Sequence, residues 1–324
     1  MVLVISEQLA RELVTIEDAL EAVEKVFAEM ARGAARNYPV VREQVGYADA
    51  VFGVKTGADV SQPLLGLKAG GYWPGNLKKG LGNHQSATLL FDPETGRASA
   101  LVSANYLTGV RTGAASAVAV KHLSRPDASV FGIIGTGAQS LHQLKAAMKV
   151  RALSEVHAFD ASADQLRAFG AEAEKLGLRF VPEQSAGDVA RAAEILVTVT
   201  PSSKPLVMAG EVRPGTHISA MGADTKGKQE LDAKLVAGAA LFADEIGQCI
   251  SIGEGQHAYG QGLMAMTDIR GTLGGVIAGL VPGRQRPDEI TIFDGTGVSL
   301  QDLVVAQLAV TRARERGLGI EAEY

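Results

Sequence analysis

The chain reads ASVFGIIGTGAQS from Ala128 to Ser140. Its short apolar, β-branched beginning is typical of a fully buried parallel strand. The run breaks at Gly135 and Gly137, and a helical pattern of apolar residues follows. Strand, glycine turn and helix form the context in which a nucleotide pyrophosphate binds at a helix N-terminus. The stretch therefore predicts the start of a dinucleotide-binding domain, with Ser140 in place of the usual third glycine.

A carboxylate follows at the distance that this fold requires. Residues 154–160 read as a second strand that ends in Asp160. A carboxylate there would accept hydrogen bonds from the adenosine ribose and repel a 2′-phosphate, which favours NAD(H) over NADP(H). The alternative is a glycine turn that binds no ligand. We expect the cofactor to contact Gly135, Thr136, Gly137, Ala138, Gln139, Ser140 and Asp160.

Strands and helices alternate through the rest of this half. Apolar runs at 179–181, 194–201, 216–222, 240–244 and 289–293 are separated by helical patterns. Such alternation predicts an α/β fold with a Rossmann-type, doubly wound parallel sheet, here over residues 124–296.

The first third of the chain has a different period. A helix begins after the N-cap Thr15, and five strands follow at 40–42, 51–54, 64–68, 87–91 and 98–102. We expect a mixed or antiparallel sheet behind an N-terminal helix. A long helix at 104–122 comes next, and its guanidinium, Arg111, requires an anion if the helix is buried. With a last helix at 300–316, residues 1–123 and 297–324 are expected to form one discontinuous α+β domain for substrate binding and dimerisation.

Composition excludes several classes of partner. The 324 residues carry a net charge of −5, which gives no reason to expect nucleic acid or an anionic membrane. The single cysteine, Cys249, suits a reducing cytoplasm and a buried position. Glu7, Arg11 and Glu12 stand where a signal peptide would be apolar, and no apolar run has membrane-spanning length. We expect a cytoplasmic protein.

Three segments follow apolar strands and are polar or rich in glycine: 200–202, 221–224 and 294–297. Ligands of open α/β sheets bind outside the carboxyl ends of the strands, so these segments together favour a site, although each alone reads as an ordinary loop. We expect further cofactor contacts from Thr200, Met221, Gly222 and, on the long helix, Thr112.

Five segments, in this order and spacing, carry a resemblance that covers essentially the whole chain. They are 65–68 (LGLK), 104–116 (ANYLTGVRTGAAS), 134–140 (IGTGAQS), 222–231 (GADTKGKQEL) and 293–298 (FDGTGV). The chain resembles the ornithine cyclodeaminase/μ-crystallin family. The resemblance implies that Arg42, Lys68 and Arg111 hold the α-carboxylate of the substrate, that Asp224 moves the proton, and that the protein is a homodimer through the first domain.

The residue types agree with these roles. Two guanidinium groups and one ammonium form an anion site, although Arg42 could equally be a surface charge. Asp224 suits acid–base work, because hydride addition to a C=N bond needs a protonated nitrogen. It could instead stabilise an iminium that arrives protonated, or serve as a helix N-cap. We expect Asp224 and Lys68 to be catalytic, and we expect no metal ion.

Two departures from the cyclodeaminase pattern disfavour the cyclisation of ornithine. The segment after Asp224 reads Thr-Lys-Gly-Lys where that subgroup has Cys-Pro-Gly-Lys, and Gly295 replaces the usual serine. His84 or Ser86, at the start of a strand, could bind a second polar group of the substrate, such as a distal carboxylate; a structural histidine is the alternative.

These observations predict an NAD(H)-dependent oxidoreductase that reduces a small α-imino acid to an α-amino acid. The candidate reaction is iminosuccinate to L-aspartate, with alanine dehydrogenase and cyclic imino-acid reductase close behind. Ornithine cyclodeamination is the alternative among enzymes. A μ-crystallin-like ligand-binding protein is the alternative from another class.

Overall fold

The computed structural model describes residues 1–323. The chain forms two compact units, one from Met1–Arg111 together with the segment that begins at Val298, the other from Thr112–Gly297. The division falls inside the long helix α3 (Asn105–Leu123), whereas the sequence-based boundary left that whole helix in the first domain. Within residues 1–323, no helix is long and apolar enough to cross a membrane.

The described part of the first unit contains an eight-stranded mixed sheet in the order β18-β1-β7-β6-β5-β4-β2, with β3 also on β4. Every pairing is antiparallel except the parallel pair β1 and β7. The predicted mixed sheet is confirmed. Its strands are β1 (Val2–Ile5), β2 (Ala35–Asn37), β3 (Val41–Gln44), β4 (Val51–Asp59), β5 (Leu64–Tyr72), β6 (His84–Phe91), β7 (Ala98–Ser103) and β18 (Ile320–Ala322).

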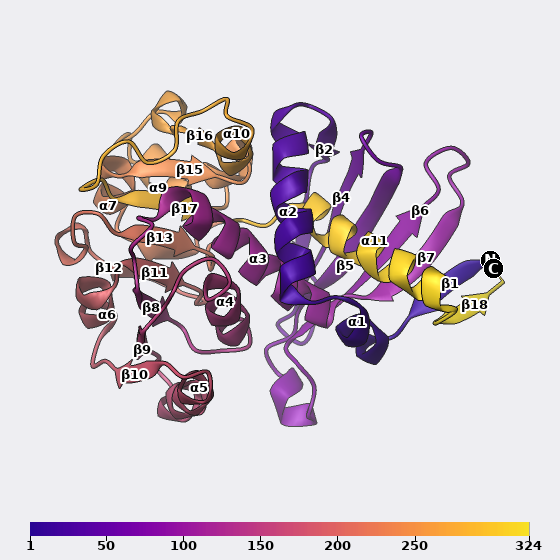
Figure 1. Cartoon of the computed structure of the whole chain (residues 1–324), viewed down its shortest axis with the longest axis horizontal. Coiled ribbons are helices and arrows are strands. Elements are labelled where there is room, and N and C mark those ends of the chain that lie inside the picture. Colours follow the sequence, from indigo (N-terminus) through magenta and orange to yellow (C-terminus); the bar gives the residue numbers. More distant parts are fainter. Residues whose placement is uncertain (324) are drawn as a thin grey trace. The chain divides into compact units, whose positions relative to one another are not determined.

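Two long helices, α2 (Ile16–Ala31) and α11 (Ser299–Arg316), lie side by side in this unit (Figure 1). Thr15 caps α2 through a capping box with Asp18, as the sequence predicted. Helix α11 packs on β4, β5 and β6. It comes very close to β4, because a Cβ at Gly57 would lie 2.6 Å from Ser299 Oγ. The unit also holds α1 (Glu7–Leu13) and the 3₁₀ helix η1 (Asn76–Lys79).

Five short elements of this unit were not predicted: β1, α1, β2, η1 and β18. The three strands have three or four residues each, too few to show a period of two. The pairing partners of β1 and β18 also lie far along the chain.

The second unit contains a sheet in the order β10-β9-β8-β11-β13-β17-β15-β16, all of it parallel. The predicted Rossmann-type sheet is therefore confirmed, and β17, the last strand of this unit along the chain, lies between β13 and β15. The strands are β8 (Val130–Ile134), β9 (Glu155–Phe159), β10 (Arg179–Pro182), β11 (Ile195–Thr198), β13 (His217–Ala220), β15 (Ala240–Ala243), β16 (Gly271–Thr272) and β17 (Thr291–Asp294), with β12 (Ser203–Val207) and β14 (Gln229–Leu231) as a separate pair.

Every residue of β11, β13, β15 and β17 is buried, so both faces of the sheet centre are covered, as parallel sheets require. Cys249 is buried in this apolar core, as expected. Besides its part of α3, this unit has the helices α4 (Ser140–Ala147), α5 (Ala163–Lys175), α6 (Ala186–Ala192), α7 (Ala233–Gly238), α8 (Ile246–Cys249), α9 (Gly255–Gly260) and α10 (Leu273–Ile277), with 3₁₀ turns η2 (Ala209–Glu211) and η3 (Met266–Asp268). Figure 1 shows α4, α5, α6, α7, α9 and α10 around the sheet.

Candidate functional site

The glycine turn after β8 has the backbone that its sequence indicated. Gly135 has a φ of +96°, and a Cβ there would lie 2.8 Å from the Val199 carbonyl oxygen, so only glycine fits. Asp160 Oδ2 accepts hydrogen bonds from Thr136 N (2.6 Å) and Thr136 Oγ1 (3.0 Å). The acid predicted at the end of the second strand therefore lies directly against the turn.

The turn leads into α4, whose first residue is Ser140. Ser140, in the place of the third glycine, is buried, and its hydroxyl donates to the Gly137 carbonyl oxygen (2.7 Å). Gly137 and Ala138 are exposed, and a Cβ at Gly137 would have no atom within 3.4 Å. An accessible glycine backbone at a helix N-terminus fits a nucleotide pyrophosphate.

The loops after β11 and β13 leave the same edge of the sheet as this turn. Thr200 is half-buried, whereas Met221 and Gly222 are buried. The remaining predicted cofactor residue, Thr112, lies on α3 with 9% of its surface exposed. All of these predicted cofactor residues belong to the second unit.

Asp224 lies on the loop after β13, with 29% of its side chain exposed. Its Oδ1 accepts hydrogen bonds from Lys228 Nζ (2.7 Å) and Thr225 Oγ1 (3.2 Å). No helix begins at this loop, so the interpretation of Asp224 as a helix N-cap is wrong. The residue remains a half-exposed carboxylate beside an ammonium group, at the carboxyl edge of the sheet.

A buried ion cluster occupies the first unit. Asp302, in the first turn of α11, accepts hydrogen bonds at Oδ1 from Lys68 Nζ (3.0 Å) and Arg111 Nε (2.8 Å). The three side chains are at most 8% exposed. Arg111 Nη1 also donates to Gln301 Oε1 (2.7 Å). The prediction that Arg111 requires an anion is met inside the protein, by a residue that the sequence analysis did not single out.

Strand register places further polar residues on the sheet face that carries Lys68. Side chains alternate along a strand, so residues opposite one another share a face. Lys55 on β4 is opposite Lys68, which is opposite Thr88 on β6. In the next row Arg42, Gly53, Gly70 and Ser86 follow one another across four strands, and in the row beyond it His84 faces Tyr72. The two glycines leave the row without side chains between Arg42 and Ser86.

His84 is electrically neutral in this surrounding. Burial, followed by the charges of Lys68 and Arg111, lowers the pKa of His84 to about 4. A neutral imidazole can donate one hydrogen bond and accept another, so His84 adds polarity without charge.

The structure thus brings Lys68 and Arg111 onto one carboxylate and places Arg42, His84 and Ser86 on the same sheet face. Asp160 and Asp224 belong to the second unit. Asp302, Lys55 and Lys228 were not predicted as site residues from the sequence. A signal existed for Lys55, because a turn centred on residues 60–63 pairs Asp59 with Leu64 and therefore Lys55 with Lys68.

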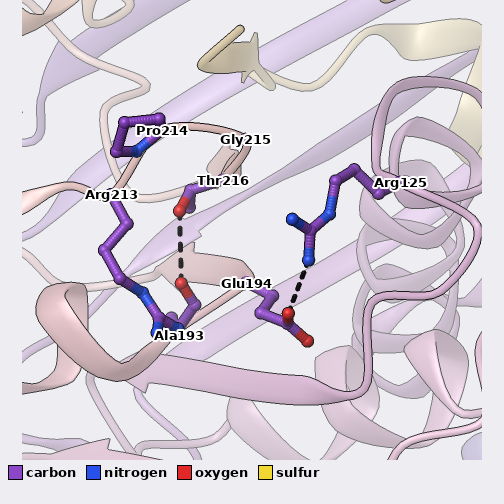
Figure 2. A pocket seen from close by; sticks show the side chains of 7 residues that line it. All are labelled: Arg125, Ala193, Glu194, Arg213, Pro214, Gly215 and Thr216. Atoms are coloured by element: carbon purple, nitrogen blue, oxygen red, sulfur yellow. Dashed lines mark hydrogen bonds and ion pairs between the residues drawn. The ribbon is translucent and has the colours of Figure 1, made fainter. Parts of the chain in front are cut away.

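A small cavity of about 120 Å³ lies elsewhere in the second unit, at the amino ends of its strands. Figure 2 shows Arg125 paired with Glu194 (2.5 Å) and the Thr216 hydroxyl donating to the Ala193 carbonyl oxygen (3.2 Å). These bonds join the starts of neighbouring strands, on the edge opposite to the glycine turn. The cavity is therefore separate from the candidate site.

The sequence of the chain is similar to that of known proteins. A model of the ornithine cyclodeaminase/mu-crystallin family matches residues 2–317. The iminosuccinate reductase of Paracoccus denitrificans (strain Pd 1222) is 50% identical over 321 residues, which cover 99% of each chain.

Two solved structures match over the whole chain. The crystal structure of the iminosuccinate reductase of Paracoccus denitrificans in complex with NAD+ has a TM-score of 0.94 at 49% identity, covering 100% of this chain and 99% of that one. An archaeal alanine dehydrogenase, a dimer with bound NAD, has a TM-score of 0.95 at 36% identity, again covering 100% and 99%.

Proposed function

The chain belongs to the ornithine cyclodeaminase/mu-crystallin family, and from that premise we propose that it is an NAD-dependent oxidoreductase that reduces small α-imino acids to α-amino acids. The observation that carries the proposal is made within the second unit. A nucleotide-type glycine turn and a half-exposed aspartate, Asp224, leave the same carboxyl edge of one parallel sheet. A hydride source and a proton-transfer group at one edge are what the reduction of a C=N bond requires.

The proposed cofactor contacts are the backbone from Gly135 to Ser140, the Asp160 carboxylate, and the loops at Thr200 and Met221–Gly222, with Thr112. Asp160 still has lone pairs for a ribose hydroxyl beyond those that Thr136 and Ser162 use. When bound, NADH supplies the hydride.

Lys68 and Arg111 are proposed to bind the α-carboxylate of the substrate. Arg42, at the end of the row that contains Gly53 and Gly70, is proposed to bind it as well. Asp302 holds the two buried cations in place before substrate arrives, so little reorganisation accompanies binding. Asp224 is proposed to deliver the proton to the imine nitrogen, or to stabilise an iminium. Lys228 fixes the orientation of its carboxylate.

The charge on the sheet face favours iminosuccinate, and hence L-aspartate as product. Arg42, Lys55, Lys68 and Arg111 place cationic groups in this part of the first unit, where Asp302 is the acid that pairs with Lys68 and Arg111. A dicarboxylate would place a second negative charge among these cationic groups, whereas the substrates of alanine dehydrogenase or of a cyclic imino-acid reductase each have one carboxylate. The similarity to the Paracoccus iminosuccinate reductase supports the same choice.

Ornithine cyclodeamination is the second candidate, and the same charges disfavour it. The distal amine of ornithine would lie among cations. A μ-crystallin-like carrier is the remaining candidate, and the ordered pair Asp224–Lys228 favours catalysis over it.

We also propose a homodimer through the first unit. Helix α11 covers the sheet face of Lys68, whereas the opposite face carries exposed apolar side chains, among them Val41 (56% exposed), Phe52 (42%) and Leu101 (41%). Exposed apolar faces of this kind mark protein–protein contacts, and a second copy is the partner that symmetry favours. Phe52→Asp should then shift the sedimentation mass towards the monomer.

The compartment proposed is the cytoplasm.

The test of the proposed function is a substrate screen that follows NADH absorbance. Oxaloacetate with ammonia, pyruvate with ammonia, pyruvate with methylamine, and a cyclic imino acid represent the imine classes. We expect NADH oxidation to be fastest with oxaloacetate and ammonia. Absence of oxidation with every imine would overturn the reductase proposal, and preference for a monocarboxylate would overturn only the choice of substrate.

A further inference from the structure

A single buried carboxylate joins the two loops that follow β11 and β13. Glu230, at the centre of β14, has no exposed surface. Its Oε1 accepts a hydrogen bond from Thr200 N (2.5 Å), and its Oε2 accepts one from Gly222 N (3.0 Å). Both donors lie just past the ends of adjacent parallel strands, where the loops diverge. Glu230 therefore sets the separation of these loops.

The fit around this carboxylate is tight. A Cβ at Gly222 would lie 2.4 Å from Glu230 Oε2 and 2.5 Å from the Thr200 carbonyl oxygen. Glycine is thus required at residue 222 if the carboxylate is to reach both amides.

A second buried carboxylate holds Glu230 itself. Glu254 Oε1 accepts from Glu230 N (2.7 Å), and Glu254 Oε2 accepts from Leu231 N (3.1 Å). Two residues on, Gln256 Oε1 accepts from Gly227 N (2.8 Å), and the His257 ring bonds the Lys228 carbonyl oxygen (2.9 Å). The segment 227–231, which includes the Lys228 partner of Asp224, is held by polar side chains of residues 254–257.

The energetic cost of this arrangement is high. Burial raises the pKa of both Glu230 and Glu254, so ionisation of these side chains is unfavourable at this depth. Two backbone donors to each carboxylate offset part of that cost. A link that served only to close a loop could be made by neutral groups at a lower cost.

We infer that Glu230 is a positioning residue for hydride and proton transfer: by bridging Thr200 N and Gly222 N, it fixes the two loops that carry the proposed cofactor contacts and Asp224. The inference rests on the proposed function and deepens it. Misplacement of reacting groups by about 1 Å costs roughly 10²-fold in rate, so loss of one of the two bonds should be visible in kcat.

Glu230→Gln is the informative variant. Its amide keeps the shape of the side chain but accepts at one oxygen only, so one of the two backbone amides loses its acceptor. Glu289→Gln is the matched control, because Glu289 is also a buried glutamate that accepts from a backbone amide (Gln285 N, 2.9 Å) and pairs with Arg270, at the opposite edge of the same sheet.

Three measurements separate positioning from stability. In Glu230→Gln, kcat should fall by roughly 10- to 100-fold, and the isotope effect on kcat with NADH deuterated at C4 should rise, because hydride transfer becomes slower. Hydrogen exchange without cofactor should accelerate in peptides that contain the Thr200 and Gly222 amides. Glu289→Gln should lower Tm while leaving kcat and these peptides unchanged.

An unchanged kcat, unchanged exchange at these peptides, or an equal loss of kcat in a Glu289→Gln protein of equal Tm would overturn the positioning role. A wild-type protein that oxidises NADH with no imine would instead overturn the proposed function, whatever the variants do.

Discussion

Asp302 Oδ1 lies 3.0 Å from Lys68 Nζ, and both side chains are almost completely buried. Burial lowers the pKa of Lys68 to about 7; Asp302 opposes that decrease, whereas Arg111 and Lys55 add to it. Although burial opposes it, the charges of Arg111 and Lys68 hold the pKa of Asp302 below its usual range. The lysine proposed to bind substrate is thus half-protonated near neutral pH only because this acid is beside it.

The first prediction concerns Asp302→Asn. A carboxylate of the substrate binds the protonated form of Lys68, so kcat/KM for the imino acid should fall as pH rises above about 7. Removing the Asp302 charge lowers the pKa of Lys68 further, so in the variant this decline should begin at a lower pH. The measurement is the pH profile of kcat/KM, with Asp18→Asn, which breaks an ion pair with Arg312 elsewhere in the same unit, as the control. If kcat/KM declined at the same pH in the wild type and in Asp302→Asn, the assignment of Lys68 as a group that binds the substrate carboxylate would be contradicted.

The nearby positions show what the sequence could and could not predict. The turn at Gly135 and the acid at Asp160 are local features, read from strand, glycine and spacing alone, and the structure places them in contact. Arg111 was predicted to need an anion, yet its partner lies 191 residues further along the chain. Nothing in the segment around Asp302 distinguishes this acid from a solvated one in a first helical turn, because its burial depends on how closely α11 packs on the sheet.

The loop of Asp224 shows the same limit of prediction from the local sequence. An aspartate after a strand reads equally as a helix N-cap or as a loop carboxylate, and short-range propensity does not separate the two. The bridge that Glu230 makes to Thr200 N and Gly222 N is harder still to predict from the sequence, because it depends on β14 lying beside two other strand ends.

The second prediction concerns cofactor choice. Asp160→Ser removes the negative charge that would repel a 2′-phosphate, so the ratio of kcat/KM for NADPH to that for NADH should rise. Because Asp160 also holds Thr136 N, NADH should bind more weakly as well. Initial rates with each cofactor give the ratio. The control is Asp164→Ser, which should leave the ratio unchanged. Asp164 is exposed and forms an ion pair with Arg167, its neighbour on the same helix. A constant ratio in Asp160→Ser would show that another group selects the cofactor.

The third prediction concerns Lys55→Met. Lys55 lies opposite Lys68 on the face that carries the proposed substrate site, and it is half-buried. If its charge favours a dicarboxylate, the variant should raise KM for iminosuccinate by roughly 10-fold, in the range of a lost charge-assisted hydrogen bond, and change KM for a monocarboxylic imine much less. Lys78→Met, at an exposed lysine of η1, is the control. Equal increases in KM for both substrates would place Lys55 at the shared α-carboxylate instead.

The last prediction separates catalysis from ligand binding at Asp224. Asp224→Asn keeps the size of the side chain and its place beside Lys228, but an amide neither accepts nor delivers the proton that the imine nitrogen needs. We expect kcat to fall by about 10²- to 10⁴-fold, the usual contribution of a general acid, while the dissociation constant of NADH, followed by fluorescence, stays close to that of the wild type. The residue lies on a loop and is 29% exposed, so its replacement should leave Tm nearly unchanged. Full activity in this variant would favour a substrate that is protonated before it binds and needs no acid from the protein, whereas equal loss of turnover and NADH binding would make Asp224 a structural residue of the cofactor site.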